Sequence, residues 1–255
     1  MTVPQHPTKH RLEPLFTARD FRRYEASRTG SPVPPPPPNV VLVFGARWER
    51  RLDRAYRRTF EPRSGVYRVG AGVGIVRVPG PGAPCSAIVV EELIALGVRN
   101  FVIVGLAGSL NPRLQAGSVV LCTKALRDEG TSYHYLRPGK FVAPDRGLTR
   151  RLRAALARVG DPYRAGPTWT IDAPYRETVG EVRRYRKLGI LTVEMEASAV
   201  FAVTRCRRAA AAALFVISDV LDESGWEPRF RDTGPGLGRA LQVALDACAR
   251  RRTAR

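Results

Sequence analysis

The feature that most constrains this chain is a repeated order of apolar strand, glycine turn and helix. Val40–Phe44 is a continuous apolar run that ends at Gly45, and Phe101–Val104 is a second run that ends at Gly105. Unbroken apolar runs of this length are typical of strands that are buried on both faces of a sheet. A helical pattern over residues 83–96 separates the two runs. This order predicts parallel strands connected by helices.

The same alternation continues to the end of the chain. Further strands are expected at two places within 66–78 and at 118–123, 165–171, 190–194 and 211–217, and further helices at 147–158, 177–188, 195–206 and 235–252. The pattern predicts an α/β fold with three layers, α/β/α, in which helices flank a central mixed, largely parallel sheet. A chain of 255 residues is commonly one such domain.

Residues 1–39 differ in composition from the rest of the chain. They are rich in Pro, Arg and His, and the proline run within 31–39 favours an extended polyproline II conformation. We therefore predict an N-terminal arm over 1–39 and a single catalytic domain over 40–255. A short helix near 19–25 is expected to pack on the body of the protein or on a neighbouring subunit.

Composition argues against membrane, metal and disulfide classes. No apolar run of about 18 residues is present, and the N-terminus lacks the pattern of an export signal, so we expect a cytoplasmic protein with no membrane partner. The four cysteines, Cys85, Cys122, Cys206 and Cys248, stand far apart without CxxC spacing or a nearby histidine pair. We expect reduced thiols, no metal and no cofactor.

The net charge of +19 arises from 42 basic and 23 acidic residues. Such a field attracts anions, so phosphate, nucleotides and nucleic acids are physically reasonable partners. However, the arginines are spread along the chain, without one basic block or a stripe interleaved with aromatic residues. The simpler interpretation is an arginine-rich composition that solvates helix surfaces, and we do not expect a nucleic-acid partner.

Acidic side chains directly follow two of the predicted buried strands. Glu194 and Glu196 flank Met195 after one strand, and Asp219 follows another. Ligands of open α/β sheets bind outside the carboxyl ends of the strands, where such carboxylates accept hydrogen bonds or protonate a departing group. An equally good interpretation of the two glutamates is the first turn of a helix, where the helix dipole stabilises acidic residues whatever the function.

Several motifs, in order and spacing, resemble the superfamily of nucleoside phosphorylases and nucleosidases, which includes purine nucleoside phosphorylases, uridine phosphorylases and methylthioadenosine nucleosidases. The motifs are Phe44-Gly45, Gly80–Leu93, Gly105–Gly108 with Asn111-Pro112, Ala116–Val120, Arg127–Ser132, Thr170–Arg176, Val193–Ala199 and Ile217–Val220. The resemblance covers residues 40–250. It implies a phosphorylase-like fold, cleavage of the N-glycosidic bond of a nucleoside, and a homo-oligomer.

The resemblance also implies roles for the carboxylates. Glu196 would hold the 2′ and 3′ hydroxyls of the ribose, Met195 would lie against the sugar, and Glu194 would support the same pocket. Asp219, beside Ser218, would face and protonate N7 of the base. Members of the family that are specific for uridine have no acid at this position, so Asp219 favours a purine substrate.

The base-stacking position departs from the family pattern. Pro174 falls where the family usually has a phenylalanine, so Tyr175 is our candidate for the stacking ring, and a buried structural tyrosine is an equal alternative. Trp226 follows Asp219 by a few residues. It is interpreted either as part of a flap over the base or as a structural anchor.

The attacking group departs from the pattern as well. Related phosphorylases bind phosphate through a glycine after the first strand, a nearby arginine, a second arginine and a Ser or Thr. The corresponding positions here are Gly45, one of Arg47 and Arg50, Ile103 and Leu106. Ile103 and Leu106 supply none of the charge-assisted donors that a desolvated phosphate requires.

Nucleosidases of the family attack with water, and a glutamate shortly after the first-strand glycine acts as the base. Glu49 lies close to this position, offset by one residue, and an exposed carboxylate in a helix first turn is the alternative interpretation. We favour hydrolysis with a nucleoside and water as substrates, because the phosphate contacts are apolar. Phosphorolysis of a purine nucleoside or uridine, and a catalytically reduced nucleoside- or nucleotide-binding protein, remain the alternatives.

Overall fold

A computed structural model of the protein describes residues 4, 6, 8–45, 47–70, 72–160 and 162–249, except for the side chains of Arg47 and Glu49. The strands are β1 (Asn39–Phe44), β2 (Phe60–Glu61), β3 (Val66–Gly70), β4 (Val73–Val78), β5 (Asn100–Ser109), β6 (Val119–Asp128), β7 (Phe141–Val142), β8 (Tyr163–Ile171), β9 (Thr192–Glu194), β10 (Ala210–Asp222) and β11 (Gly225–Pro228). The helices are α1 (Ala18–Thr29), α2 (Arg47–Tyr56), α3 (Ala83–Ala95), α4 (Arg146–Val159), α5 (Val179–Lys187), α6 (Ala197–Cys206) and α7 (Gly234–Cys248). Short 3-10 helices include η3 (Thr131–His134), η4 (Pro174–Arg176) and η5 (Phe230–Thr233).

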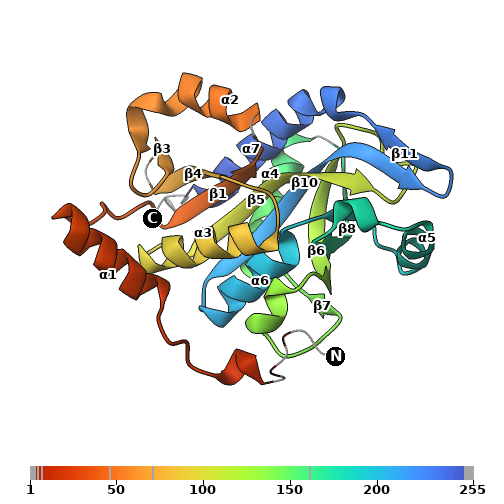
Figure 1. The fold of residues 1–255 in the computed structure, drawn as a ribbon. Helices are drawn as coiled ribbons and strands as arrows, with labels where there is room; N and C mark the ends of the chain where they lie inside the picture. Colours follow the sequence, from red (N-terminus) through yellow and green to blue (C-terminus); the bar gives the residue numbers. More distant parts are fainter. Residues whose placement is uncertain are drawn as a thin grey trace.

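All strands belong to one mixed sheet, with helices on both of its faces (Figure 1). The strand order is β11-β10-β6-β8-β9-β5-β1-β4-β3-β2, with β7 on β6 and an additional pairing of β10 with β5. The longest pairings, β5 with β10 and β6 with β8, are parallel, whereas β3 with β4 and β10 with β11 are antiparallel. The predicted three-layer α/β/α class is confirmed.

The central strands are buried on both faces. In β1, Val40 and Leu42 belong to the core beneath α3 and α6, whereas Val41 and Val43 belong to the core beneath α2, α4 and α7. All four side chains are fully buried. Each stabilises the fold by about 1.5–3 kcal/mol through burial, which explains why the strand reads as one unbroken apolar run.

The structure adds elements that the apolar runs did not predict. β5, β6 and β10 continue past their apolar segments to Ser109, Asp128 and Asp222. Strand β11 was not predicted, and helix α2 was anticipated only in the alternative interpretation of Glu49. Helix α2 is mostly charged and contributes Trp48 and Leu52 to the core. Pairing of a strand depends on its backbone groups, so it continues through glycine and polar residues where a neighbour is present.

The N-terminal segment packs on the body of the same chain. Thr17 and Asp20 form a capping box at the start of α1. Arg22 of α1 forms ion pairs with Glu25 and with Glu92 of α3. Of the two packing modes expected for this helix, the described residues therefore show the one on the body.

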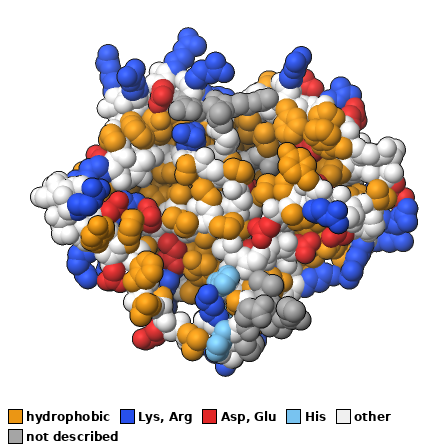
Figure 2. Space-filling model, viewed as in Figure 1, with side chains coloured by type: hydrophobic (Ala, Val, Ile, Leu, Met, Phe, Trp, Pro, Cys, Tyr) orange, Lys and Arg blue, Asp and Glu red, His pale blue; other side chains and the backbone are white. Residues whose placement is uncertain are grey.

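Among the described residues, none of the helices combines the length and the apolar character needed to cross a bilayer. On the face seen in Figure 2, the basic side chains form no single stripe. Lysine and arginine side chains are scattered around the periphery of that face, with hydrophobic side chains across its middle (Figure 2). This distribution agrees with the interpretation of the charge as a general feature of the composition.

Candidate active site

The candidate site lies where the neighbours of β5 change. On one edge, β1 pairs with residues 100–104 of β5, and β9 pairs with Gly108 and Ser109. Residues 105–107 therefore lie between these two pairings, at the kind of switch point where open α/β sheets bind ligands. Gly45 follows β1 at this level, with a φ of +88° that favours glycine.

Gly108 lies between the two acidic segments. It pairs with Val193 of β9 on one edge of β5 and with Asp219 of β10 on the other edge. A Cβ atom at Gly108 would lie 2.4 Å from Leu221 Cδ1, 3.0 Å from Asp219 Oδ2 and 3.1 Å from Val193 Cγ1. The absence of a side chain at this position is thus what allows Asp219 to lie over β5.

Glu194 uses its carboxylate to cap α6. Its Oε2 accepts hydrogen bonds from the backbone N–H groups of Glu196, at 2.8 Å, and Ala197, at 2.7 Å. Its Oε1 accepts a bond from the Thr170 hydroxyl at 2.5 Å. Both carboxylate oxygens therefore accept hydrogen bonds within the protein, and Glu194 stabilises the helix N-terminus from the end of β9, not from within the first turn.

We predict that Glu194→Ala destabilises the protein by about 2–5 kcal/mol, because it leaves two buried backbone N–H groups without an acceptor. Glu194→Gln should lose much less, since its amide oxygen still accepts from these groups and its nitrogen donates to Thr170. The free energy of unfolding from urea denaturation measures both. Equal stability of the alanine variant and the wild type would contradict the capping role.

Glu196 connects the start of α6 to the start of α3. Its Oε1 accepts a hydrogen bond from the Gly82 N–H at 2.7 Å, and its Oε2 accepts a long bond of 3.3 Å from the Met195 N–H. The side chain is buried, at 8% exposure. Gly82 has a φ of +99°, and a Cβ there would contact Met195 Cε at 4.0 Å. Because Oε2 accepts only the long bond from Met195 among the hydrogen bonds of the described residues, it retains most of its capacity to accept hydrogen bonds from a ligand.

Burial raises the pKa of both glutamates, and the charge of Glu196 raises the pKa of Glu194 further. Hydrogen bonds from Thr170 and from the backbone oppose this shift at Glu194. The pair therefore holds a proton to a higher pH than two exposed carboxylates would.

Asp219 is held by two donors. The Ser218 hydroxyl donates to its Oδ1 at 2.5 Å, and the Trp226 indole Nε1–H donates to its Oδ2 at 2.9 Å. Asp219 is 9% exposed and Ser218 is buried. The Trp226 contact crosses from β11 to β10 and ties the hairpin to the carboxylate.

The predicted base-stacking residues take no part in these hydrogen bonds. Pro174 and Tyr175 lie in η4, and the Tyr175 side chain is fully exposed. The alternative interpretation of Tyr175 as a buried structural residue is therefore wrong. Stacking of the Tyr175 ring on a base remains a prediction.

On the side of the site that was expected to receive the nucleophile, the segment of β5 around Gly105 is apolar. Ile103 is fully buried in the core, and Leu106 packs partly buried against the opposite core. The aromatic rings of Phe44 and Phe215 lie 3.8 Å from where a Cβ on Gly105 would be. Arg50 of α2 is exposed. The side chains of Arg47 and Glu49 lie outside the described residues, so the predicted roles of both stay predictions.

Glu177 is an acidic neighbour of the site that sequence reasoning missed. It follows η4 and is partly buried. Burial, together with the charges of Asp219 and Glu181, raises its pKa from the usual 4.5 to about 7. No sequence signal marks it, because the effect of Asp219 depends on the fold.

We predict that Glu177→Gln stabilises the protein at pH 8 but not at pH 4. The folded state holds the Glu177 proton up to about pH 7, whereas the unfolded chain releases it near 4.5. Wild-type stability is therefore lost as the pH rises through this window, by on the order of 1–2 kcal/mol after allowance for partial exposure. Urea denaturation at both pH values measures it, with the exposed Glu227→Gln as the control. Identical pH dependence of Glu177→Gln and the wild type would contradict the shift.

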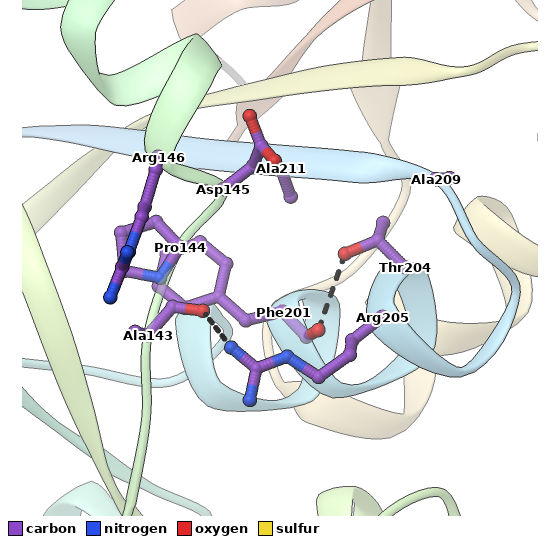
Figure 3. A pocket seen from close by; sticks show the side chains of 9 residues that line it. All are labelled: Ala143, Pro144, Asp145, Arg146, Phe201, Thr204, Arg205, Ala209 and Ala211. Carbon is purple, nitrogen blue, oxygen red and sulfur yellow. Dashed lines mark hydrogen bonds between the residues drawn. The ribbon is translucent and has the colours of Figure 1, made fainter.

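The two described cavities lie elsewhere. One of about 440 Å³ is lined by residues 143–146, Phe201, Thr204, Arg205, Ala209 and Ala211, between α6 and the start of α4 (Figure 3). The Arg205 guanidinium on its wall donates to the Ala143 carbonyl at 2.9 Å. The second, of about 410 Å³, lies between α1 and the end of α3. Neither is lined by Glu196 or Asp219.

Comparison with known proteins identifies the family and similar relatives of this chain. Residues 49–249 match a family model described as the phosphorylase superfamily. A uridine phosphorylase from Thermococcus kodakarensis is 29% identical over 184 residues, which cover 66% of this chain and 64% of the relative. The match thus spans less than two thirds of that relative's length.

Two solved structures share the fold. A purine nucleoside phosphorylase from Toxoplasma gondii, in complex with immucillin-H, superimposes with a TM-score of 0.72 and 23% identity, and the match covers 86% of this chain and 92% of that one. An AMP nucleosidase from Bacteroides thetaiotaomicron gives a TM-score of 0.71 and 19% identity, with coverage of 91% and 96%. At these identities the likeness concerns the architecture.

Proposed function

The chain belongs to the phosphorylase superfamily, and from this premise we propose that it cleaves the N-glycosidic bond of a purine nucleoside. The observation that carries the proposal is the placement of two buried carboxylates on either side of β5. Glu196 follows β9 and Asp219 lies on β10, and both strands pair with Gly108 or its neighbour. In this proposal, Glu196 is the acidic partner of the sugar and Asp219 is the acidic partner of the base.

In the proposed reaction, Glu196 accepts hydrogen bonds from the ribose hydroxyls and fixes the sugar. The bond from C1′ to the base nitrogen breaks, and its electrons pass to the base. Asp219 donates its proton to N7 as this negative charge develops. The sugar passes through an oxocarbenium-like state, whose positive charge the Glu196 carboxylate stabilises in this proposal.

Water is the nucleophile that the apolar segment 103–106 of β5 favours. A phosphate beside this segment would lose its hydration without gaining charge-assisted donors, because Leu106 is apolar and Ile103 is fully buried in the opposite core. Glu49 is the proposed base that removes a proton from the attacking water. The name of the structural neighbour, AMP nucleosidase, is consistent with hydrolysis on this fold.

Phosphorolysis is the second candidate, and the sequence relatives favour it. The matched relatives include uridine phosphorylases and a purine nucleoside phosphorylase. In this case Gly45 and one of the two arginines Arg47 and Arg50 would bind the phosphate.

Incubation of the purified protein with inosine, adenosine, guanosine, uridine and AMP, with and without phosphate, separates these functions. Free base released without phosphate supports hydrolysis, and ribose 1-phosphate formed only with phosphate supports phosphorolysis. Binding of a nucleoside without turnover would leave the third alternative, a catalytically reduced binding protein. Release from uridine but from no purine nucleoside would overturn the assignment of Asp219.

A further inference from the structure

The β10–β11 hairpin places an aromatic donor beside the candidate acid. The hairpin projects at the right-hand end of the molecule in Figure 1. In its antiparallel register, Asp219 lies opposite Pro228, and Leu221 lies opposite Trp226. Residues two apart on a strand share a face, so Trp226 is the diagonal neighbour of Asp219. Its Nε1–H donates to Asp219 Oδ2 at 2.9 Å.

The exposure of Trp226 is unusual for a residue that anchors a hairpin. Its side chain is 61% exposed, whereas Asp219 is 9% exposed. The indole therefore directs its polar edge inward and leaves an open apolar face. Phe230 of η5, also exposed, lies edge-on to it with ring centroids 6.3 Å apart. Together the two rings form an aromatic rim next to the carboxylate.

The two donors fix the orientation of the carboxylate. Ser218 holds Oδ1 and Trp226 holds Oδ2, so rotation of the Asp219 side chain breaks at least one bond. Each oxygen of a carboxylate has two lone-pair positions, so Oδ2 keeps one that can carry the proton transferred to N7 of the base. A proton transfer of this kind depends on sub-ångström placement, and a shift of about 1 Å costs up to 100-fold in rate.

We propose that Trp226 is a positioning residue, which orients Asp219 through its indole N–H and offers its exposed ring as the platform for the nucleobase. The inference rests on the proposed function, which makes Asp219 the acid and a nucleobase the ligand. Tyr175 and Pro174, the alternative stacking residues, make no contact with Asp219 or Trp226 among the bonds and ring contacts of the described residues.

Two substitutions separate the two roles in kinetics. Trp226→Phe keeps a ring but removes the donor, so kcat falls about tenfold or more while KM stays within twofold. Trp226→Ala removes the ring as well, so KM rises in addition. Both are expected to fold, since the side chain is largely exposed, and thermal denaturation checks this. An unchanged kcat in Trp226→Phe would overturn the positioning role, and an unchanged KM in Trp226→Ala would overturn the platform.

A second measurement is independent of catalysis. The indole N–H signals of Trp48, Trp169 and Trp226 are assigned in a ¹H–¹⁵N spectrum by single Trp→Phe substitutions. Asp219→Ala removes the acceptor of this bond, so it should shift the Trp226 signal and leave the Trp169 signal, whose donor bonds Asp128 at 2.9 Å, in place. An unmoved Trp226 signal would show that the bond is absent in solution and would overturn the inference. If no nucleoside is cleaved but the signal moves, the proposed function fails while the bond from Trp226 to Asp219 stands. Addition of free hypoxanthine to the wild type then tests the platform. A Trp226 signal that does not shift on this addition would overturn the platform role.

Discussion

Asp219→Asn lowers kcat for a purine nucleoside by about 10²- to 10⁴-fold, which is the usual contribution of a positioned general acid. The asparagine keeps the size of the side chain and an oxygen that accepts from Trp226 or Ser218. Its amide N–H is far too weak an acid to transfer a proton to N7 as the base departs. Steady-state release of hypoxanthine from inosine measures the loss, with little change expected in the thermal midpoint.

The matched control for this prediction is Asp222→Asn at the end of the same strand. Asp222 accepts hydrogen bonds from Ser224 in the hairpin turn. Its substitution therefore tests whether loss of any acidic side chain from this hairpin lowers kcat. Activity near that of the wild type is expected. Should Asp219→Asn retain more than about a third of the wild-type kcat, far above the loss expected of a general acid, Asp219 would not be that acid.

The fold was predictable where one residue pattern decides the structure. The side chains from Val40 to Val43 point alternately into two cores and are fully buried. The strand could therefore be recognised from its unbroken apolar run alone. Strand ends were not predictable in this way. β10 continues for several residues beyond Ile217 because β5 and β11 supply backbone partners, and no side-chain pattern records them.

The candidate site was predictable in its residue types but not in its contacts. Glu196 and Asp219 were marked by their places after buried strands. The partner of Glu196 is the backbone N–H of Gly82, which is 114 positions away and carries no side-chain signal. The raised pKa of Glu177 and the bond from Trp226 likewise arise from long-range packing and hairpin register. Long-range geometry of this kind has to be observed.

Glu196→Gln should lower kcat/KM by about 10²- to 10⁴-fold, because each hydrogen bond to a charged group contributes about 1.5–3 kcal/mol and the carboxylate is expected to hold two hydroxyls. The fold should survive, since the glutamine oxygen still accepts from the Gly82 N–H that now bonds Oε1 at 2.7 Å. Glu196 differs in this from Glu194, whose two oxygens are both engaged within the protein.

The substrate provides the sharpest control for this last prediction. With a 2′-deoxynucleoside, one of the two expected bonds is absent in the wild type as well, so the ratio of wild-type to Glu196→Gln activity should shrink by about tenfold or more. A ratio that is the same for the ribo- and 2′-deoxyribonucleosides would mean that Glu196 does not bind the 2′ hydroxyl. Its effect would then come from the link between α3 and α6, and the thermal midpoint of the variant would fall along with its activity.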